Sequence, residues 1–213
     1  MTVVTDNFNR ANNTSLGTNY TEVTTNLGRH LTISSNTAVP SALDSGDSIS
    51  LWTHDTFSND QYAQAKITTS GTLDQCGSGV IIRGSGGNEG TGTYIWVIAH
   101  HGATNNISIA EIVGGTYALK KQVSQSWTDG DTWRIEATGT SYTIKLNGTT
   151  VTTTTESSVT SGSPGPFYSS TITSTAIDDF EGGDLAAGMP PGLGPEELMD
   201  VVGMTANQSA MMR

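Results

Sequence analysis

Paired acidic side chains on one strand face are the arrangement that glycoside hydrolysis would require of this sequence. A retaining mechanism needs two carboxyl groups about 5–5.5 Å apart, a spacing that alternate positions of one strand can provide. Glu111 has no acidic residue two or four positions away. Asp129, Asp131 and Glu136 run across a turn into a strand, where Asp-Gly-Asp is ordinary turn chemistry. The sequence therefore predicts that the protein is not an enzyme.

Other reactive motifs are also missing from the sequence. It contains neither a G-x-S-x-G nucleophile elbow nor a phosphate-binding loop that ends in Gly-Lys-Ser/Thr. His100 and His101 are adjacent on a predicted strand, so their side chains point to opposite faces and cannot jointly bind one metal ion. Cys76 is the only cysteine, which excludes an intrachain disulfide.

A strand with apolar residues of both parities carries the first candidate binding site. Ile95, Val97 and Ala99 share one parity and are predicted to face the core. The other parity consists of Tyr94, Trp96, Ile98 and His100. If this second face is concave and exposed, Tyr94 and Trp96 can stack on sugar rings, with His100 beside them. The alternative is that both faces of the sheet are covered, by the protein itself or by a partner subunit.

The elements that would position these residues are short strands. Trp133, Ile135 and Ala137 alternate with polar residues, which predicts a strand with Trp133 in the core. The dipeptide Asn147-Gly148 indicates a two-residue hairpin turn. No long segment of helical period separates the strands, so we expect an all-β antiparallel sandwich. The predicted strands are Thr2–Phe8, Tyr20–Thr24, His30–Ser34, Ser48–His54, Tyr62–Thr68, Gly79–Arg83, Tyr94–His101, Ile107–Val113, Tyr117–Gln122, Thr132–Thr138, Tyr142–Leu146, Thr149–Thr154 and Thr171–Phe180.

Charge restricts the classes of partner. The chain has 20 acidic and 9 basic residues, giving a formal net charge of -11. Because no cluster of Lys and Arg is present, neither nucleic acid nor an anionic membrane is an expected partner. No apolar run approaches the roughly 20 residues that span a bilayer. The first residues lack the features of a secretory signal, so we expect synthesis in a host cytoplasm without a signal peptide.

The composition changes near residue 185, which predicts a sandwich domain over residues 1–184 and an arm over residues 185–213. The arm holds five of the six methionines and no aromatic residue. Residues 194–203 carry an early Pro, acidic residues in the first turn and a closing Gly, which predicts one short helix. Its apolar residues are candidates for an assembly contact, because Met adapts to imperfectly matched grooves. They are Leu198, Met199, Val201, Val202 and Met204.

Three stretches resemble the concanavalin A-like lectin/glucanase superfamily, in its laminin-G-like and phage virion-associated branches. They are Asp6-Asn7-Phe8-Asn9-Arg10 with Leu16-Gly17-Thr18-Asn19-Tyr20, then Asp131–Ala137 with Tyr142–Gly148, and finally Ile177–Gly183. The resemblance covers residues 2–184 and implies a jelly roll whose last strand returns beside its first. The superfamily includes sugar-binding proteins, glucanases and structural virion parts, so the resemblance does not define the function.

The acidic end of the domain is a second candidate site, for calcium. Asp178 and Asp179 lie close together in the last predicted strand, and the resemblance places Asp6 near them. Calcium binds several oxygen ligands, and related sandwiches hold a structural ion where the terminal strands meet. The alternative, which we favour, is a solvated acidic strand end, so that no cofactor is required.

Two functions from different classes follow. The first is a non-enzymatic structural virion protein of a tailed bacteriophage, such as a capsid decoration or cement protein or another head or tail component. Its partners would be other virion proteins and further copies of itself in a homo-oligomer. The alternative is a lectin-like module that binds glycans through the aromatic face of Tyr94 and Trp96.

Removal of residues 186–213 tests the predicted arm. We expect the truncated chain to remain folded and to lose oligomerisation or particle attachment, because the short apolar stripe adds only a few kcal/mol at about 25 cal/mol per Å². Gel filtration and particle-binding assays measure both properties. Equal assembly by the truncated and the full chain would contradict the assembly role.

Overall fold

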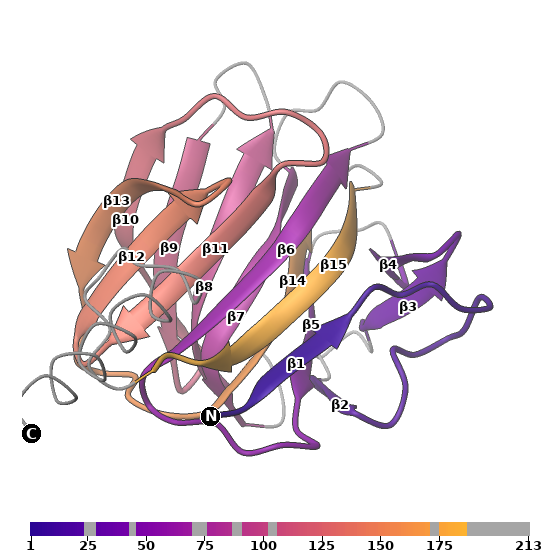
Figure 1. Ribbon diagram of the computed structural model, residues 1–213, viewed down its shortest axis with the longest axis horizontal. Helices are drawn as coiled ribbons and strands as arrows, with labels where there is room; N and C mark the ends of the chain where they lie inside the picture. Colours follow the sequence, from indigo (N-terminus) through magenta and orange to yellow (C-terminus); the bar gives the residue numbers. More distant parts are fainter. Residues whose placement is uncertain are drawn as a thin grey trace, which may run out of the picture.

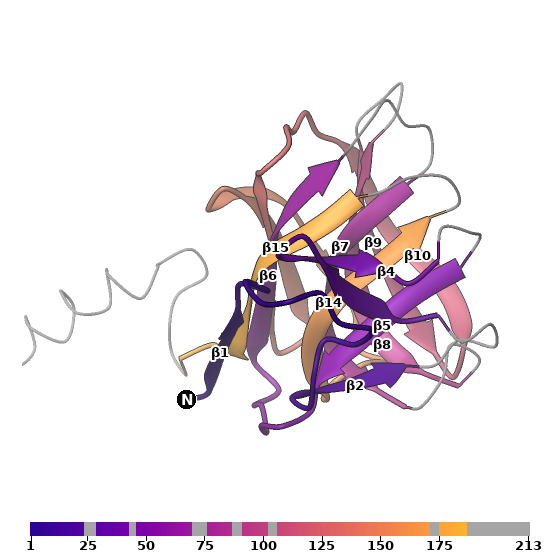
Figure 2. The same ribbon diagram turned by 90° about the vertical axis from the view of Figure 1, so that its right-hand side faces the viewer.

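The computed structural model describes residues 1–23, 29–42, 46–69, 76–86, 91–101, 106–170 and 175–186. Over these residues the chain forms two antiparallel sheets packed as a sandwich, which confirms the all-β jelly-roll prediction (Figure 1). Figure 2 shows the layers from the side, with β1, β6 and β15 on the left and β9 and β10 on the right. The described residues contain no helix that is long and apolar enough to cross a membrane.

We call the two layers the front sheet and the back sheet, after their positions in Figure 1. The front sheet has eight strands, in the order β13 (Thr149–Thr155), β12 (Ser141–Leu146), β11 (Thr132–Thr138), β6 (Gln61–Thr69), β15 (Thr175–Asp184), β4 (Thr37–Pro40) and β3 (Leu31–Ser34), with β1 (Val3–Asp6) also paired to β15. The back sheet has seven, in the order β10 (Thr116–Ser124), β9 (Asn106–Val113), β8 (Thr93–His101), β7 (Cys76–Ser85), β14 (Ser163–Ser170), β5 (Gly46–Trp52) and β2 (Tyr20–Val23).

The inner faces of both sheets form the main core. Trp133 and Ile135 of β11 are fully buried there, as their alternation predicts, and Trp127 packs edge-on against Trp133 with the ring centroids 6.3 Å apart. From the back sheet, Ile95 and Val97 of β8 face the same core. Burial of these apolar side chains is the main stabilising contribution to the fold.

Two local predictions from the sequence are confirmed. The Asn147-Gly148 turn joins β12 to β13, and its residues have φ angles of 49° and 80°, the left-handed values that a type I′ turn requires. The first and last strands lie side by side, with Asp6 opposite Phe180. The last strand runs on to Asp184 and does not end at Phe180, because its pairing with β1 continues along it.

The sequence reading missed the short strand β4 and the central strand β14. The prolines of β14, Pro164 and Pro166, lack a backbone N–H and so argued against a central strand. The structure accommodates them because pairing of β14 with β5 begins only at Phe167, and its pairing with β7 is irregular between Ser163 and Gly165.

A charge bridge joins the sheets at their edge strands. Lys120 of β10 shares the parity of the inward-facing Ala118 and lies at a β-bulge between Leu119 and Lys121. Its ammonium group contacts the carboxylate of Glu111 on β9 and lies 2.5 Å from that of Glu156, which follows β13. The bridge therefore links the free edge of the back sheet to that of the front sheet.

The bridge also sets the acidity of Glu156. Burial opposes ionisation of its carboxyl group, but hydrogen bonds from Lys120 and from the backbone N–H groups of Ser157 and Ser158 outweigh that effect. The pKa of Glu156 consequently falls from 4.5 to about 2.

A pH series with Glu156→Gln tests this bridge. A carboxyl group whose folded pKa is depressed contributes stability that is complete above its unfolded pKa, here 4.5, and is lost as the pH falls toward about 2. We therefore expect the wild type to unfold at higher denaturant concentration than the variant at pH 6, and the difference to shrink steadily between those two values. A difference that does not change with pH would show that the ionised carboxylate is not the stabilising form.

Candidate functional site

The outer face of the back sheet is apolar, in contrast to the usual polar exterior of an antiparallel sandwich. Its buried residues form a cluster separate from the main core, composed of Val23, Ile49, Leu51, Ile81, Tyr94, Trp96, Ile98, Ala110, Ile112 and Phe167. Side chains of this cluster pack directly against the backbone of neighbouring strands. A Cβ atom at Gly77, for example, would lie only 2.0 Å from Cγ2 of Ile98.

Three aromatic rings stand in a row on this face. The ring of Trp96 on β8 is stacked on that of Phe167 on β14, with centroids 5.5 Å apart and an interplanar angle of 12°. On its other side lies the ring of Tyr117 on the edge strand β10, at 6.0 Å and 31°. Trp96 therefore lies between two rings, and Tyr117 is the ring at the β10 end of the row.

The three rings of the row differ in how much of each side chain is exposed to solvent. Phe167 is 0% exposed and Trp96 is 6% exposed, whereas Tyr117 is 56% exposed. The prediction that Tyr94 and Trp96 offer an open platform needs correction, because Tyr94 is only 1% exposed. Their shared face was predicted correctly, but both rings are buried. His100 continues β8, and its side chain lies outside the described part of the structure.

Tyr117 was placed on a predicted strand but not recognised as a site residue. It pairs with Ile112, which in turn lies opposite Tyr94, so it belongs to the same outer face. The sequence did show that Tyr117 and Leu119 share one parity of the strand. In the structure Leu119 is 48% exposed. The sequence did not show that β10 lies at the edge of the sheet, where an aromatic ring stays accessible.

Uncharged polar side chains continue this edge beyond Leu119. The amide nitrogen of Gln122 donates a hydrogen bond to the hydroxyl of Ser108, at 3.0 Å. The hydroxyl of Ser124 donates a longer hydrogen bond to the amide oxygen of Asn106, at 3.4 Å. Both pairs join β10 to β9. Exposed apolar groups and neutral hydrogen-bonding groups thus lie along one strand edge.

This face does not carry the paired carboxylates of a retaining hydrolase. In the described strands of the back sheet the acidic residues are Glu22, Asp47 and Glu111. Glu111 pairs with the inward-facing Ile95, and Glu22 pairs with Ser50 on that same inner side. Of the three, only Asp47 shares the parity of the outer face. Acid–base hydrolysis by two neighbouring side chains has no structural basis among these strands.

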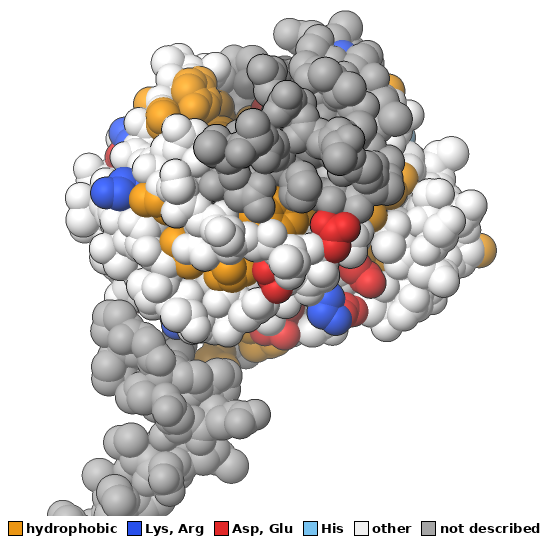
Figure 3. Space-filling model, turned by 90° about the horizontal axis from the view of Figure 1, so that it is seen from above, with side chains coloured by type: hydrophobic (Ala, Val, Ile, Leu, Met, Phe, Trp, Pro, Cys, Tyr) orange, Lys and Arg blue, Asp and Glu red, His pale blue; other side chains and the backbone are white. Residues whose placement is uncertain are grey.

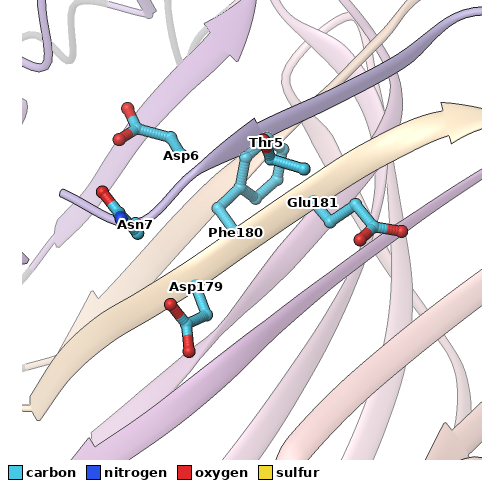
Figure 4. Close-up of a pocket in the computed structure, with 6 residues that line it drawn as sticks. All are labelled: Thr5, Asp6, Asn7, Asp179, Phe180 and Glu181. Carbon is cyan, nitrogen blue, oxygen red and sulfur yellow. The ribbon is translucent and has the colours of Figure 1, made fainter.

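A pocket of about 340 Å³ lies elsewhere, where β1 meets β15 (Figure 4). A bulge between Asp178 and Glu181 shapes it, with Asp179 at a φ of 45°. Figure 4 shows that the carboxylates of Asp6, Asp179 and Glu181 point in different directions. Figure 3 shows acidic and basic side chains close together on one side of the upper end of the sandwich.

Basic side chains of the protein form ion pairs with two of these carboxylates. Arg10 donates two hydrogen bonds to Asp6, at 2.6 and 2.9 Å, and this contact raises the pKa of the guanidinium. Lys66 lies 2.5 Å from Asp179. The Asp178 carboxylate accepts the backbone N–H of Asp179.

The calcium site considered for Asp6, Asp178 and Asp179 finds no support in the described part of the chain. Among the described residues no three acidic, His or Cys side chains are arranged to hold a metal ion. The terminal strands do meet as expected, but their carboxylates pair with Arg10 and Lys66 and do not converge on one point. The assembly-arm residues Leu198, Met199, Val201, Val202 and Met204 lie outside the described residues.

Known structures share this fold. The carbohydrate-binding module CBM66 from Bacillus subtilis aligns with a TM-score of 0.60 and 16% identity, covering 78% of this chain and 97% of that one. The exoplasmic/lumenal domain of VIP36, bound to Ca2+ and Man3GlcNAc, aligns at 0.55 and 10% identity, covering 81% and 85%. The GH43 protein BlXynB from Bacillus licheniformis aligns at 0.60 and 10% identity, covering 84% of this chain but 38% of that one.

No protein-family model matches the sequence, and no curated protein matches it. The structural likeness establishes the concanavalin A-like fold shared by galectin-like modules, lectins and glycosidases. None of these neighbours is a virion protein, so the phage branch of the resemblance has no support from them.

Stability measurements on Trp96→Ala and Tyr117→Ala test the difference between the two rings. We expect Trp96→Ala to lower the free energy of unfolding by about 3–5 kcal/mol, because it leaves a cavity in a packed layer. Tyr117→Ala removes one exposed ring contact and should cost about 1 kcal/mol. Chemical denaturation gives both values, and equal losses would show that Tyr117 is as buried as Trp96.

Proposed function

We propose that this protein is a non-catalytic carbohydrate-binding module that contacts glycans at the β9–β10 edge of its back sheet. The observation that carries the proposal is the free face of Tyr117. It ends a row of stacked rings and is 56% exposed, while the rings behind it are buried.

The chemistry of this edge suits a sugar. A sugar ring presents C–H groups on its faces and hydroxyl groups around its rim, so it needs an apolar surface with hydrogen-bonding groups nearby. Tyr117 provides a flat ring held in place by Trp96. The Gln122–Ser108 pair provides amide and hydroxyl groups farther along β10.

The fold neighbours support the same class of ligand. Two of them are a carbohydrate-binding module and a lumenal domain bound to an oligosaccharide. At 16% and 10% identity they indicate the fold, and fold alone does not determine function. The proposal therefore rests on Tyr117 and its surroundings, and the neighbours make a glycan the first ligand to test.

We propose binding without cleavage. The outer face of the back sheet offers Asp47 as its acidic side chain among the described strands, and one carboxyl group cannot provide both acid and nucleophile. Because enzymes are among the fold neighbours, hydrolysis stays in the test as an outcome to be measured.

A glycan array with the full chain tests the proposal. We expect a defined subset of glycans to bind, and Tyr117→Ala to weaken binding at least tenfold, because an aromatic contact contributes about 1.4 kcal/mol or more. Val3→Ala is the matched control, since Val3 is similarly exposed, at 49%, on the front sheet. Release of reducing sugar from bound glycans should stay at background.

Retention of glycan binding in Tyr117→Ala would place the site elsewhere, and absence of binding to every glycan would overturn the proposal. The virion hypothesis stays a separate prediction. Mass spectrometry of purified particles tests it, and gel filtration tests the expected homo-oligomer.

A further inference from the structure

We infer that the ligand is an uncharged oligosaccharide that lies lengthwise along the edge strand β10, which specifies the substrate class of the proposed glycan-binding function. The inference rests on that proposed function. Its own basis is the β-bulge in β10, which decides which side chains of this strand face outward.

The outward positions of β10 form a strip that is longer than one sugar ring. Tyr117 and Leu119 come first, followed by Gln122 and then Ser124, which pairs with Asn106 across the edge. At about 3.3 Å per residue, and allowing for the bulge, the strip is about 20 Å long. A ligand that uses all of it must be a chain of several sugars.

The bulge decides which side chain follows Leu119 on this strip. In a regular strand the alternation begun at Tyr117 and Leu119 would place Lys121 outward. The register shift instead pairs Lys121 with Ile109, a residue of the main core, and brings Gln122 opposite the outward Ser108. An amide thus occupies the place that an ammonium group would otherwise take.

The other lysine of β10, Lys120, is paired with acidic side chains on the inner face. The ammonium group of Lys120 lies between the carboxylates of Glu111 and Glu156, and these contacts raise the pKa of Lys120. The three groups hold the bulge in register from within the sandwich. The outward side is left with a phenol ring, an aliphatic side chain, amides and hydroxyls.

Such a strip favours neutral sugars over acidic ones. Amide and hydroxyl groups can both donate to and accept from sugar hydroxyls. The register places no lysine at the outward positions Tyr117, Leu119, Gln122 and Ser124, although Lys121 is exposed beside them, and the chain carries a net charge of -11 that repels anions. Neutral polymers avoid both penalties.

Calorimetric titration of the full chain tests the inference. The probes are neutral hexasaccharides of glucan, mannan, galactan and fructan type, the disaccharide of each, and the sulfated form of any hexasaccharide that binds. We expect one neutral hexasaccharide to bind more tightly than its disaccharide, and sulfation to weaken it by about tenfold or more.

Variants on β10 locate the contact. Gln122→Ala and Ser124→Ala should each weaken binding of the neutral hexasaccharide by roughly twofold to tenfold, the range for loss of one hydrogen bond. Lys121→Ala is the matched control, exposed on the same strand but paired with the inward Ile109, and should leave the affinity unchanged.

The failure modes are distinct. Equal or tighter binding of the sulfated form, abolished by Lys121→Ala, would overturn this inference while the proposed glycan-binding function stands. Equal affinity for disaccharide and hexasaccharide would also overturn it. If no sugar binds and the chain instead self-associates through Tyr117, both proposals are wrong and the edge is a protein interface.

Discussion

The back sheet is apolar on both faces, and this constraint decides where the molecule can present an aromatic side chain to a ligand. Along β8, one parity packs into the main core and the other packs with Phe167 and its neighbours in a second layer. A sheet buried on both sides offers a ligand only its edges. The accessible aromatic group is consequently Tyr117 on the outermost strand, while the more conspicuous Trp96 holds it in position.

Charged and uncharged side chains of β10 also lie on different faces of the strand. Lys120 faces inward between two carboxylates, where the ion pairs join the edges of both sheets. The bulge beside it brings Gln122 opposite the outward Ser108. The ion pairs of Lys120 and the outward amide of Gln122 therefore lie on opposite faces of the same edge strand.

Periodicity predicted much of the fold, since it depends on local alternation. It placed Trp133 in the core and assigned Tyr94 and Trp96 to one face. Burial of Trp96 could not be predicted, because Phe167, which stacks on it, belongs to a proline-containing strand that local propensity disfavours. The ion pairs of Lys120 likewise join it to Glu111 on the paired strand β9 and to Glu156, which follows β13, and local alternation does not reveal the second of these partners.

The most direct test of the account is a titration of the 15N-labelled full chain with the tightest-binding neutral hexasaccharide, followed by amide chemical shifts. The account predicts that the largest changes fall on β9 and β10, from Tyr117 to Ser124, with little change at the β1–β15 pocket around Asp6 and Asp179. Largest changes at that pocket, with β10 unaffected, would contradict it.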